Sequence, residues 1–310
     1  MTHSLSFNHE GRFRILQLTD LHYTDGDEAD LRTVALIERL LLQEQPDLVV
    51  ITGDLVYGEQ NAACLSDVLK PLTQPGTAPW TFVFGNHDSE FGLKDRRALW
   101  KLAADLPGCL AWEDSGCPEG TGNHSLTIRS ADGTLEWLLL LLDSGAYHPD
   151  AAIGGYAYVS LAQIDWYRQQ IQQAAAENPA VQAILFQHIP LPEYEEMWRF
   201  ETCYGSRRDP ICCPRVNSGF FNAILEAGHT RAVFVGHDHV NDFWGVLHGV
   251  MLGYGRATGY HTYGAQDFMH GGRVFELDLS KPGEITTYVR LEDGTKVDQP
   301  WRYEPRERRA

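Results

Sequence analysis

The sequence has no long apolar run. Its densest apolar segment, from Trp137 to Leu142, is far too short to cross a bilayer. Residues Met1 to Gln17 carry His, Glu and Arg among isolated apolar residues, which is not the core of a signal peptide. We therefore expect a cytoplasmic protein with no membrane partner.

Cysteine is also scarce. Six cysteines in 310 residues do not make the framework of a disulfide-rich domain, and they lack the paired spacing of zinc fingers. Two of them, Cys212 and Cys213, are adjacent. This pattern indicates mostly free thiols, as in the reducing cytoplasm, with a Cys203–Cys212 disulfide as the less favoured alternative.

Positive charge is in deficit. The chain has 25 Lys and Arg against 42 Asp and Glu, which gives a formal net charge of −17. Nucleic acids and anionic membranes attract clustered Lys and Arg, so this balance argues against both as partners. An acidic protein can still bind a phosphate ester if bound cations supply the local field. The composition therefore favours a metal site over a basic cradle.

Short apolar segments alternate with amphipathic ones through most of the chain, which predicts an α/β protein with parallel strands. The expected strands are 12–19, 47–52, 80–84, 124–128, 135–142, 181–186, 231–235, 243–254, 272–279 and 285–291. The expected helices are 30–45, 64–72, 96–105, 160–176 and 218–227, and Asp30 is placed to cap the first of them.

The chain shows no internal repeat and no linker, so we expect one domain over residues 1–310. Its ligand-bearing core would run from about 12 to 240, with further strands over 243–291. The tail from 302 to 310 is charged and is expected to fray.

Polar side chains that can bind metal ions follow five of the expected strands. They are Asp20, His22, Asp54, Asn86, His87, His188, His237 and His239. The carboxyl ends of parallel strands lie at one edge of a sheet, so these groups are expected to meet. Carboxylate and amide oxygens together with imidazoles suit Mn, Fe or Zn. Eight groups exceed the needs of one ion, so we expect two ions, with Asp54 from the middle strand as the bridge.

The order Asp-x-His, Gly-Asp, Gly-Asn-His-Asp, His and Gly-His-x-His from Asp20 to His239 resembles the calcineurin-like metallophosphoesterase superfamily. Segments 212–221, 235–242 and 254–260 look most like its small branch related to purple acid phosphatases. The resemblance implies a four-layer α/β/β/α sandwich, in which two mixed β-sheets are flanked by helices.

The resemblance also implies roles for these residues. One ion would be held by Asp20, His22, Asp54 and His239, and the other by Asp54, Asn86, His188 and His237. A hydroxide that bridges the ions would attack phosphorus in line. His87 would donate a proton to the leaving alkoxide, and Asp88 would orient the His87 ring.

Tyr57 introduces an alternative. Residues 53–57 also match the Gly-Asp-x-x-Tyr signature of purple acid phosphatases, in which the tyrosinate binds ferric iron and no histidine stands at the position of His22. We favour His22 as the ligand and Tyr57 as a wall of the pocket. The other candidates for the substrate pocket are Tyr204, Arg207, Asn217 and Tyr260. Arg207 can bind a phosphate or be a solvated loop residue.

The expected function is that of a metal-dependent phosphomonoesterase acting on a small-molecule phosphate ester. A phosphodiesterase of the cyclic-nucleotide type would use the same ligands and is the second hypothesis. A catalytically silent regulatory domain that keeps its metals is the third hypothesis. The presence of both Asp54 and His87 argues against a silent domain, because loss of the bridging acid or the proton donor is its usual mark.

Overall fold

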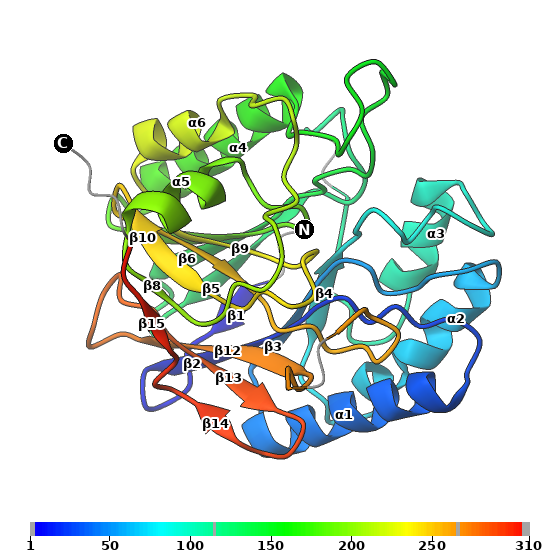
Figure 1. Ribbon diagram of the computed structural model, residues 1–310. Coiled ribbons are helices and arrows are strands. Elements are labelled where there is room, and N and C mark those ends of the chain that lie inside the picture. The colour runs from blue at the N-terminus through cyan, green and yellow to red at the C-terminus, as the bar shows by residue number, and fades with distance from the viewer. Residues whose placement is uncertain (1–3, 114–115, 265–266, 306–310) are drawn as a thin grey trace.

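The computed structural model describes residues 4–113, 116–264 and 267–305, and it has two β-sheets that pack face to face (Figure 1). The larger sheet contains β1 (Ser4–Ser6), β5 (His124–Arg129), β6 (Leu135–Leu141), β7 (Gln182–Phe186), β8 (Cys203–Tyr204), β9 (Thr230–Val235), β10 (Trp244–Leu247), β11 (Val250–Tyr254) and β15 (Arg302–Tyr303). Its spatial order is β1-β5-β6-β7-β9-β11-β10-β8-β15. In its centre, β6, β7, β9 and β11 run parallel.

The smaller sheet contains β2 (Arg12–Leu18), β3 (Leu48–Thr52), β4 (Trp80–Val83), β12 (Gly271–Asp278), β13 (Thr286–Leu291) and β14 (Lys296–Val297). Its order is β14-β13-β12-β2-β3-β4. Strands β2, β3 and β4 are parallel, whereas β12 runs antiparallel to β2. Both sheets are therefore mixed, as expected.

Helices cover the outer face of each sheet (Figure 1). The smaller sheet is covered by α1 (Glu28–Glu44), α2 (Asn61–Val68) and α3 (Arg96–Ala104), and a 3-10 turn spans Lys70–Thr73. The larger sheet is covered by α4 (Leu161–Glu177), α5 (Glu193–Phe200) and α6 (Phe220–Ala227). The predicted four-layer α/β/β/α sandwich is confirmed. Among the helices of the described residues, none is long and apolar enough to cross a membrane.

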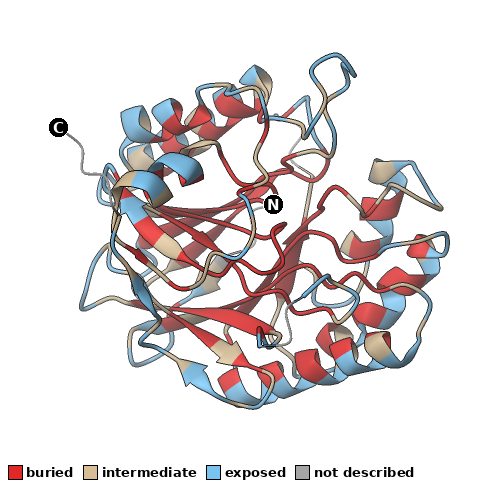
Figure 2. Cartoon of the chain, viewed as in Figure 1, coloured by how far each residue is buried: buried red, intermediate tan, exposed pale blue. Residues whose placement is uncertain are grey.

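Three apolar cores lie between the four layers. A strand contributes side chains to two of these cores, because its successive side chains point to opposite faces of the sheet. In β2, Phe13 and Ile15 pack between the sheets, while Leu16 and Leu18 pack under the helices. Alternate side chains of a strand point to opposite faces, so a central strand must be apolar on both. The buried strands and the exposed outer faces of the helices are seen in Figure 2.

Some local expectations differ from the structure. Asp27, rather than Asp30, caps α1, and the buried Asp30 carboxylate accepts hydrogen bonds from Gly26 N and other backbone groups of the preceding turn. Where one strand was expected over 243–254, β10 and β11 form a hairpin, which turns at His248 and Gly249 with φ values of 50° and 84°.

Several elements were not expected at all. Helix α5 and strands β1, β8 and β14 lie outside the expected ranges, and they are short or at sheet edges. The expected fraying was wrong for Arg302–Tyr303, which forms β15 and pairs with β8. Residues 306–310 of that tail lie outside the described residues. The six cysteines all lie in the described part of the chain and form no disulfide, so the alternative Cys203–Cys212 disulfide is not present.

We predict that Phe275→Ala lowers the free energy of unfolding by about 3–5 kcal/mol, because it leaves a cavity between the sheets. The Phe275 ring is fully buried and makes edge-to-face contacts with Phe234 and Phe186, at centroid distances of 4.5 and 5.7 Å. Urea denaturation followed by circular dichroism measures the change. Leu42→Ala on α1, where Leu42 is 76% exposed, is the matched control and should change stability little. Equal effects of the two substitutions would contradict this view of the core.

Candidate metal centre

The predicted ligands meet at the edge where the carboxyl ends of parallel strands from both sheets lie. Asp20 and His22 follow β2, Asp54 follows β3, and Asn86 follows β4 in the smaller sheet. The larger sheet supplies the three remaining histidines, which follow β7 and β9: His188, His237 and His239. None of the seven side chains belongs to a residue more than 7% exposed. The strand-end prediction is therefore matched by the geometry.

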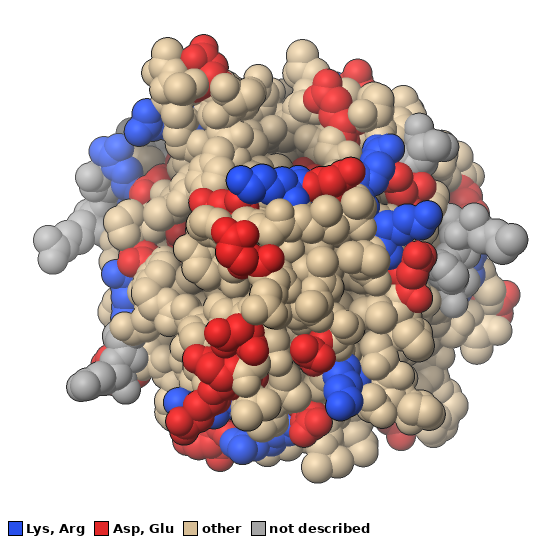
Figure 3. All heavy atoms as spheres, turned by 90° about the vertical axis from the view of Figure 1, so that its right-hand side faces the viewer, with Lys and Arg blue, Asp and Glu red and all other residues tan. Residues whose placement is uncertain are grey.

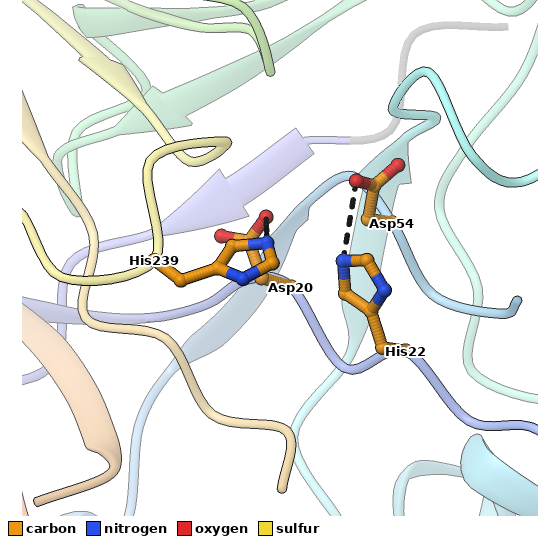
Figure 4. A group of neighbouring side chains, drawn as sticks. All are labelled: Asp20, His22, Asp54 and His239. Atoms are coloured by element: carbon orange, nitrogen blue, oxygen red, sulfur yellow. Dashed lines mark ion pairs between the residues drawn. The ribbon is translucent and has the colours of Figure 1, made fainter. Parts of the chain in front are cut away.

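The first group consists of Asp20, His22, Asp54 and His239, whose candidate ligand atoms all lie within 4.8 Å of one another. His22 Nε2 lies 3.3 Å from Asp54 Oδ2, and His239 Nε2 lies 3.6 Å from Asp20 Oδ1 (Figure 4). Thr19 Oγ1 donates a hydrogen bond of 2.8 Å to Asp20 Oδ2, which orients that carboxylate. These four residues can surround one cation.

The second group consists of Asp54, His188 and His237, again with ligand atoms within 4.8 Å of one another. His188 Nε2 lies 3.2 Å from Asp54 Oδ2, 3.2 Å from His237 Nδ1 and 3.1 Å from Asn86 Oδ1. His188 Nδ1 lies 2.8 Å from the carbonyl oxygen of Thr52. A proton on Nδ1 for that contact leaves the Nε2 lone pair directed at the other three groups, as in metal-binding histidines.

Asp54 belongs to both groups. Its Oδ1 accepts a hydrogen bond of 2.8 Å from His87 N, while its Oδ2 faces His22 and His188. Within the described part of the chain, the buried atoms Asp54 Oδ2 and His22 Nε2 have no hydrogen-bond partner of good geometry. Buried polar atoms rarely lack one, so these two fit ligands of a cation. Asp54 is placed to bridge two ions.

The electrostatics of the cluster also fit cation binding. Burial alone would raise the pKa of Asp54, but the adjacent His188 and His22 outweigh burial and hold the pKa well below its usual range. Burial would lower the pKa of His188, but Asp54 and Asp20 raise it to about 9. Burial, together with the charge of His188, keeps the pKa of His237 well below its usual range. An ionised, buried Asp54 requires a positive partner.

The backbone is strained at four of the predicted ligands. Asp20, His22, Asp54 and His237 have φ values of 53°, 48°, 51° and 81°. Left-handed backbone costs a non-glycine residue on the order of 1–3 kcal/mol and is concentrated at functional sites. At these positions the left-handed backbone turns the chain at the strand end, where the side chains belong to the two ligand groups.

Two glycines of the motifs allow close approach rather than an unusual φ. A Cβ on Gly85 would lie 2.1 Å from Asp54 Oδ1, and a Cβ on Gly236 would lie 1.9 Å from Thr19 Oγ1. Any larger residue would displace the carboxylate or separate the sheets. The glycines of Gly-Asn-His-Asp and Gly-His-x-His are thus required by packing around the ligands.

His87 lies at the cluster without belonging to either ligand group. Its ring centroid is 5.4 Å from that of His22, and its Nδ1 lies 2.5 Å from Glu90 Oε2. The expectation that Asp88 orients this ring was wrong. Asp88 accepts hydrogen bonds from the backbone N–H groups of residues 54, 55, 56 and 85 instead.

Glu90 is the partner of His87 that the sequence reasoning missed. The motif Gly-Asn-His-Asp draws attention to the acid next to His87, but the loop after β4 turns so that Glu90 reaches the imidazole. The buried Asp88 has a pKa raised to about 6, by burial and by the charge of Asp54. Through its backbone hydrogen bonds, Asp88 joins the loops after β3 and β4 and does not contact the His87 ring among the described hydrogen bonds.

The structure places the pocket candidates at different distances from the cluster. Tyr57 lies beside it, with its ring centroid 5.8 Å from that of His22 and 5.1 Å from that of His87. His22, not Tyr57, is in the four-residue ligand group. This geometry supports the choice of His22 as ligand and Tyr57 as pocket wall.

The other four candidates for the substrate pocket contact residues away from the predicted metal ligands. Tyr204 stacks on Trp244 at the edge of the larger sheet, and Arg207 pairs with Glu195 at 3.1 Å. Asn217 donates a hydrogen bond of 2.8 Å to Glu193. The Tyr260 hydroxyl donates a hydrogen bond to the Glu292 carboxylate, and the Arg32 guanidinium lies over the Tyr260 ring. The described structure does not bring these four side chains into contact with the predicted ligands.

Comparison with known proteins agrees with the geometry. The family model described as calcineurin-like phosphoesterase matches residues 13–241, which span every predicted ligand. This chain belongs to the calcineurin-like phosphoesterase family. The family is dinuclear and metal-dependent, and the two ligand groups that share Asp54 match that chemistry.

The proteins similar to this calcineurin-like phosphoesterase include both probable inactive phosphatases and a dimetal phosphatase. It is 33% identical to "Probable inactive purple acid phosphatase 14" and 32% identical to "Probable inactive purple acid phosphatase 29", both of Arabidopsis thaliana. The matches cover 93% of this chain and 83% and 85% of those proteins. A dimetal phosphatase from Danio rerio has the same fold, with a TM-score of 0.63 at 14% identity over 94% of this chain and 98% of that one.

We predict that Asp54→Asn depletes both ions, because the amide removes the charge and one oxygen ligand shared by the two groups. The measurement is metal content per chain of the purified protein, with about two ions expected in the wild type. His87→Ala should keep both ions, since His87 lies outside the ligand groups. Asp132→Asn in the exposed 130–134 turn is the control. Two retained ions in Asp54→Asn would show that Asp54 is not the bridge.

Proposed function

We propose that this calcineurin-like phosphoesterase hydrolyses small-molecule phosphate esters with two metal ions, and that monoesters are its main substrates. The observation that carries the proposal is the position of Asp54 between two ligand groups, with His87 immediately beside them. Paired cations at such spacing can hold both the attacking and the leaving oxygen of a phosphoryl transfer.

The chain's own groups can perform the remaining steps. Two bound cations, whether Mn, Fe or Zn, would neutralise the phosphoryl oxygens and lower the pKa of a nearby water. His87 uses Nδ1 for Glu90, so its Nε2 is available to protonate the leaving oxygen of the ester. Glu90 holds the ring in orientation and stabilises its protonated form. Asp54 fixes the loop that carries His87 by accepting from His87 N.

The word "inactive" in the names of the two Arabidopsis relatives concerns those proteins. A silent descendant of an active site is expected to lose the bridging acid or the proton donor. This chain has both Asp54 and His87, and the structure places them 2.8 Å apart, measured from Asp54 Oδ1 to His87 N. That arrangement supports an active enzyme.

The proposal predicts metal-dependent turnover of an aryl phosphomonoester. The protein is stripped with a chelator, and initial rates are measured before and after Mn, Fe or Zn is restored. We expect the apo protein to be inactive and the restored protein to recover. A bis-aryl diester with the same leaving group is assayed in parallel, and a clear preference for it would support a phosphodiesterase instead. Two ions per chain with no turnover of either ester would support a silent domain.

We predict that Glu90→Gln lowers kcat roughly 10- to 100-fold, as is typical when a residue that orients a functional group is altered. The loss should grow with the basicity of the leaving alcohol, because His87 assists only poor leaving groups strongly. His87→Ala should show the same dependence with a larger loss. Glu59→Gln, an exposed acid of the loop after β3, is the charge-matched control. A loss independent of leaving-group basicity would contradict the role given to Glu90.

A further inference from the structure

We propose that four tyrosines around the metal centre form a binding site for a planar aromatic or heteroaromatic ring carried by the phosphate ester. We name Tyr57, Tyr147, Tyr156 and Tyr263 the tyrosine collar. The proposal rests on the proposed phosphoesterase function and narrows its substrates to aryl, benzyl or nucleoside phosphates, as opposed to sugar phosphates or polyanionic esters.

Each side chain of the tyrosine collar contacts a different part of the centre. The Tyr263 ring stacks on His239 at a centroid distance of 4.1 Å, and the Tyr156 ring stands edge-on to His237 at 4.3 Å. Tyr57 contacts His22 and His87, as described above. Tyr147 Oη lies 3.4 Å from Asn86 Nδ2. A phosphate held by the two ligand groups would therefore present its ester group to these rings.

The rings of the collar come from three separate loops and remain open to solvent. Tyr57 follows β3, Tyr147 and Tyr156 lie between β6 and α4, and Tyr263 lies between β11 and β12. Tyr57, Tyr147 and Tyr263 are 36%, 47% and 53% exposed. Exposed aromatic rings grouped around a buried polar cluster are typical of ligand sites, in which apolar walls surround a few polar anchors.

The four side chains of the collar carry no positive charge of their own that could bind a second anionic group. The arginines on neighbouring loops are engaged: Arg208 pairs with Asp267 at 2.5 Å, and Arg215 donates to Ile153 O. On the face in Figure 3, residues other than Lys, Arg, Asp and Glu cover most of the surface, and much of the Lys and Arg surface adjoins Asp or Glu.

The exposed aromatic rings and the negative net charge together favour an aromatic over an anionic organic group on the phosphate ester. Aromatic faces gain most from another aromatic ring, through stacked or edge-to-face contacts. Phenol hydroxyls can also bond to the polar edge of a heteroaromatic base. A substrate with several phosphates or carboxylates would instead meet a chain with a formal net charge of −17.

The test compares two ligands that differ only in aromaticity. Benzylphosphonate and cyclohexylmethylphosphonate are titrated into the Mn-loaded protein by calorimetry, and neither requires turnover. We expect benzylphosphonate to bind about 3- to 10-fold more tightly for each ring that it contacts. Initial rates on benzyl phosphate and cyclohexylmethyl phosphate, whose alcohols have similar basicity, should show the same preference in kcat/KM. Equal affinity for the two phosphonates would overturn the proposal.

Substitutions in the tyrosine collar test whether its rings cause the preference for the benzyl ligand. Tyr57→Leu and Tyr263→Leu should each reduce the preference for the benzyl ligand, while Tyr263→Phe should retain it. Tyr158→Leu is the matched control, because Tyr158 is 37% exposed on the same loop as Tyr147 but tilts against His148. Metal content is measured for every variant, so that loss of an ion is not mistaken for loss of the ring contact. An unchanged preference in both leucine variants would overturn the proposal.

The calorimetric titration of the two phosphonates also distinguishes failure of this inference from failure of the proposed function. A benzyl preference in calorimetry without turnover of any ester would support the collar and refute the enzyme. Turnover of esters without any preference between the phosphonates would support the enzyme and refute the collar.

Discussion

The close approach of the two sheets beside the ligands is the constraint on which the centre depends. Gln17 Nε2 on β2 donates to Thr52 Oγ1 on β3 at 2.8 Å and to Val235 O on β9 at 3.1 Å, so one buried amide joins strands of both sheets. Gly236 leaves room for this approach, because a Cβ there would overlap Thr19. Without this junction, the carboxylates of one sheet could not share ions with the histidines of the other.

The centre combines ligands that stand on strand ends with loops that carry the residues of the two proposals. The ligands stand on strand ends, where strained backbone and buried carboxylates lower the stability of the protein alone, and a bound cation can restore it. Glu90 and the tyrosine collar stand on loops, where sequence change disturbs packing least.

Much of the fold and of the ligand set follows from the sequence, for a local reason. Asp20, Asp54 and His188 each lie two residues beyond the end of a short, largely apolar strand, and such short apolar segments between turn residues are typical of buried strands. Parallel strands then bring their carboxyl ends to one edge. The hairpin turn at His248 and the hydrogen bonds of Asp88 to backbone groups were not predictable in this way, because they depend on how loops turn.

By itself, the sequence determined which residues can bind metal and in what order they reach the edge of the sheets, because strand period and strand-end chemistry are local properties. Only the tertiary structure decided that Glu90 rather than Asp88 contacts His87, and which tyrosines surround the centre. Those contacts join residues from separate loops and sheets, and their distances depend on how the whole chain packs. Motif spacing carries no information about that packing.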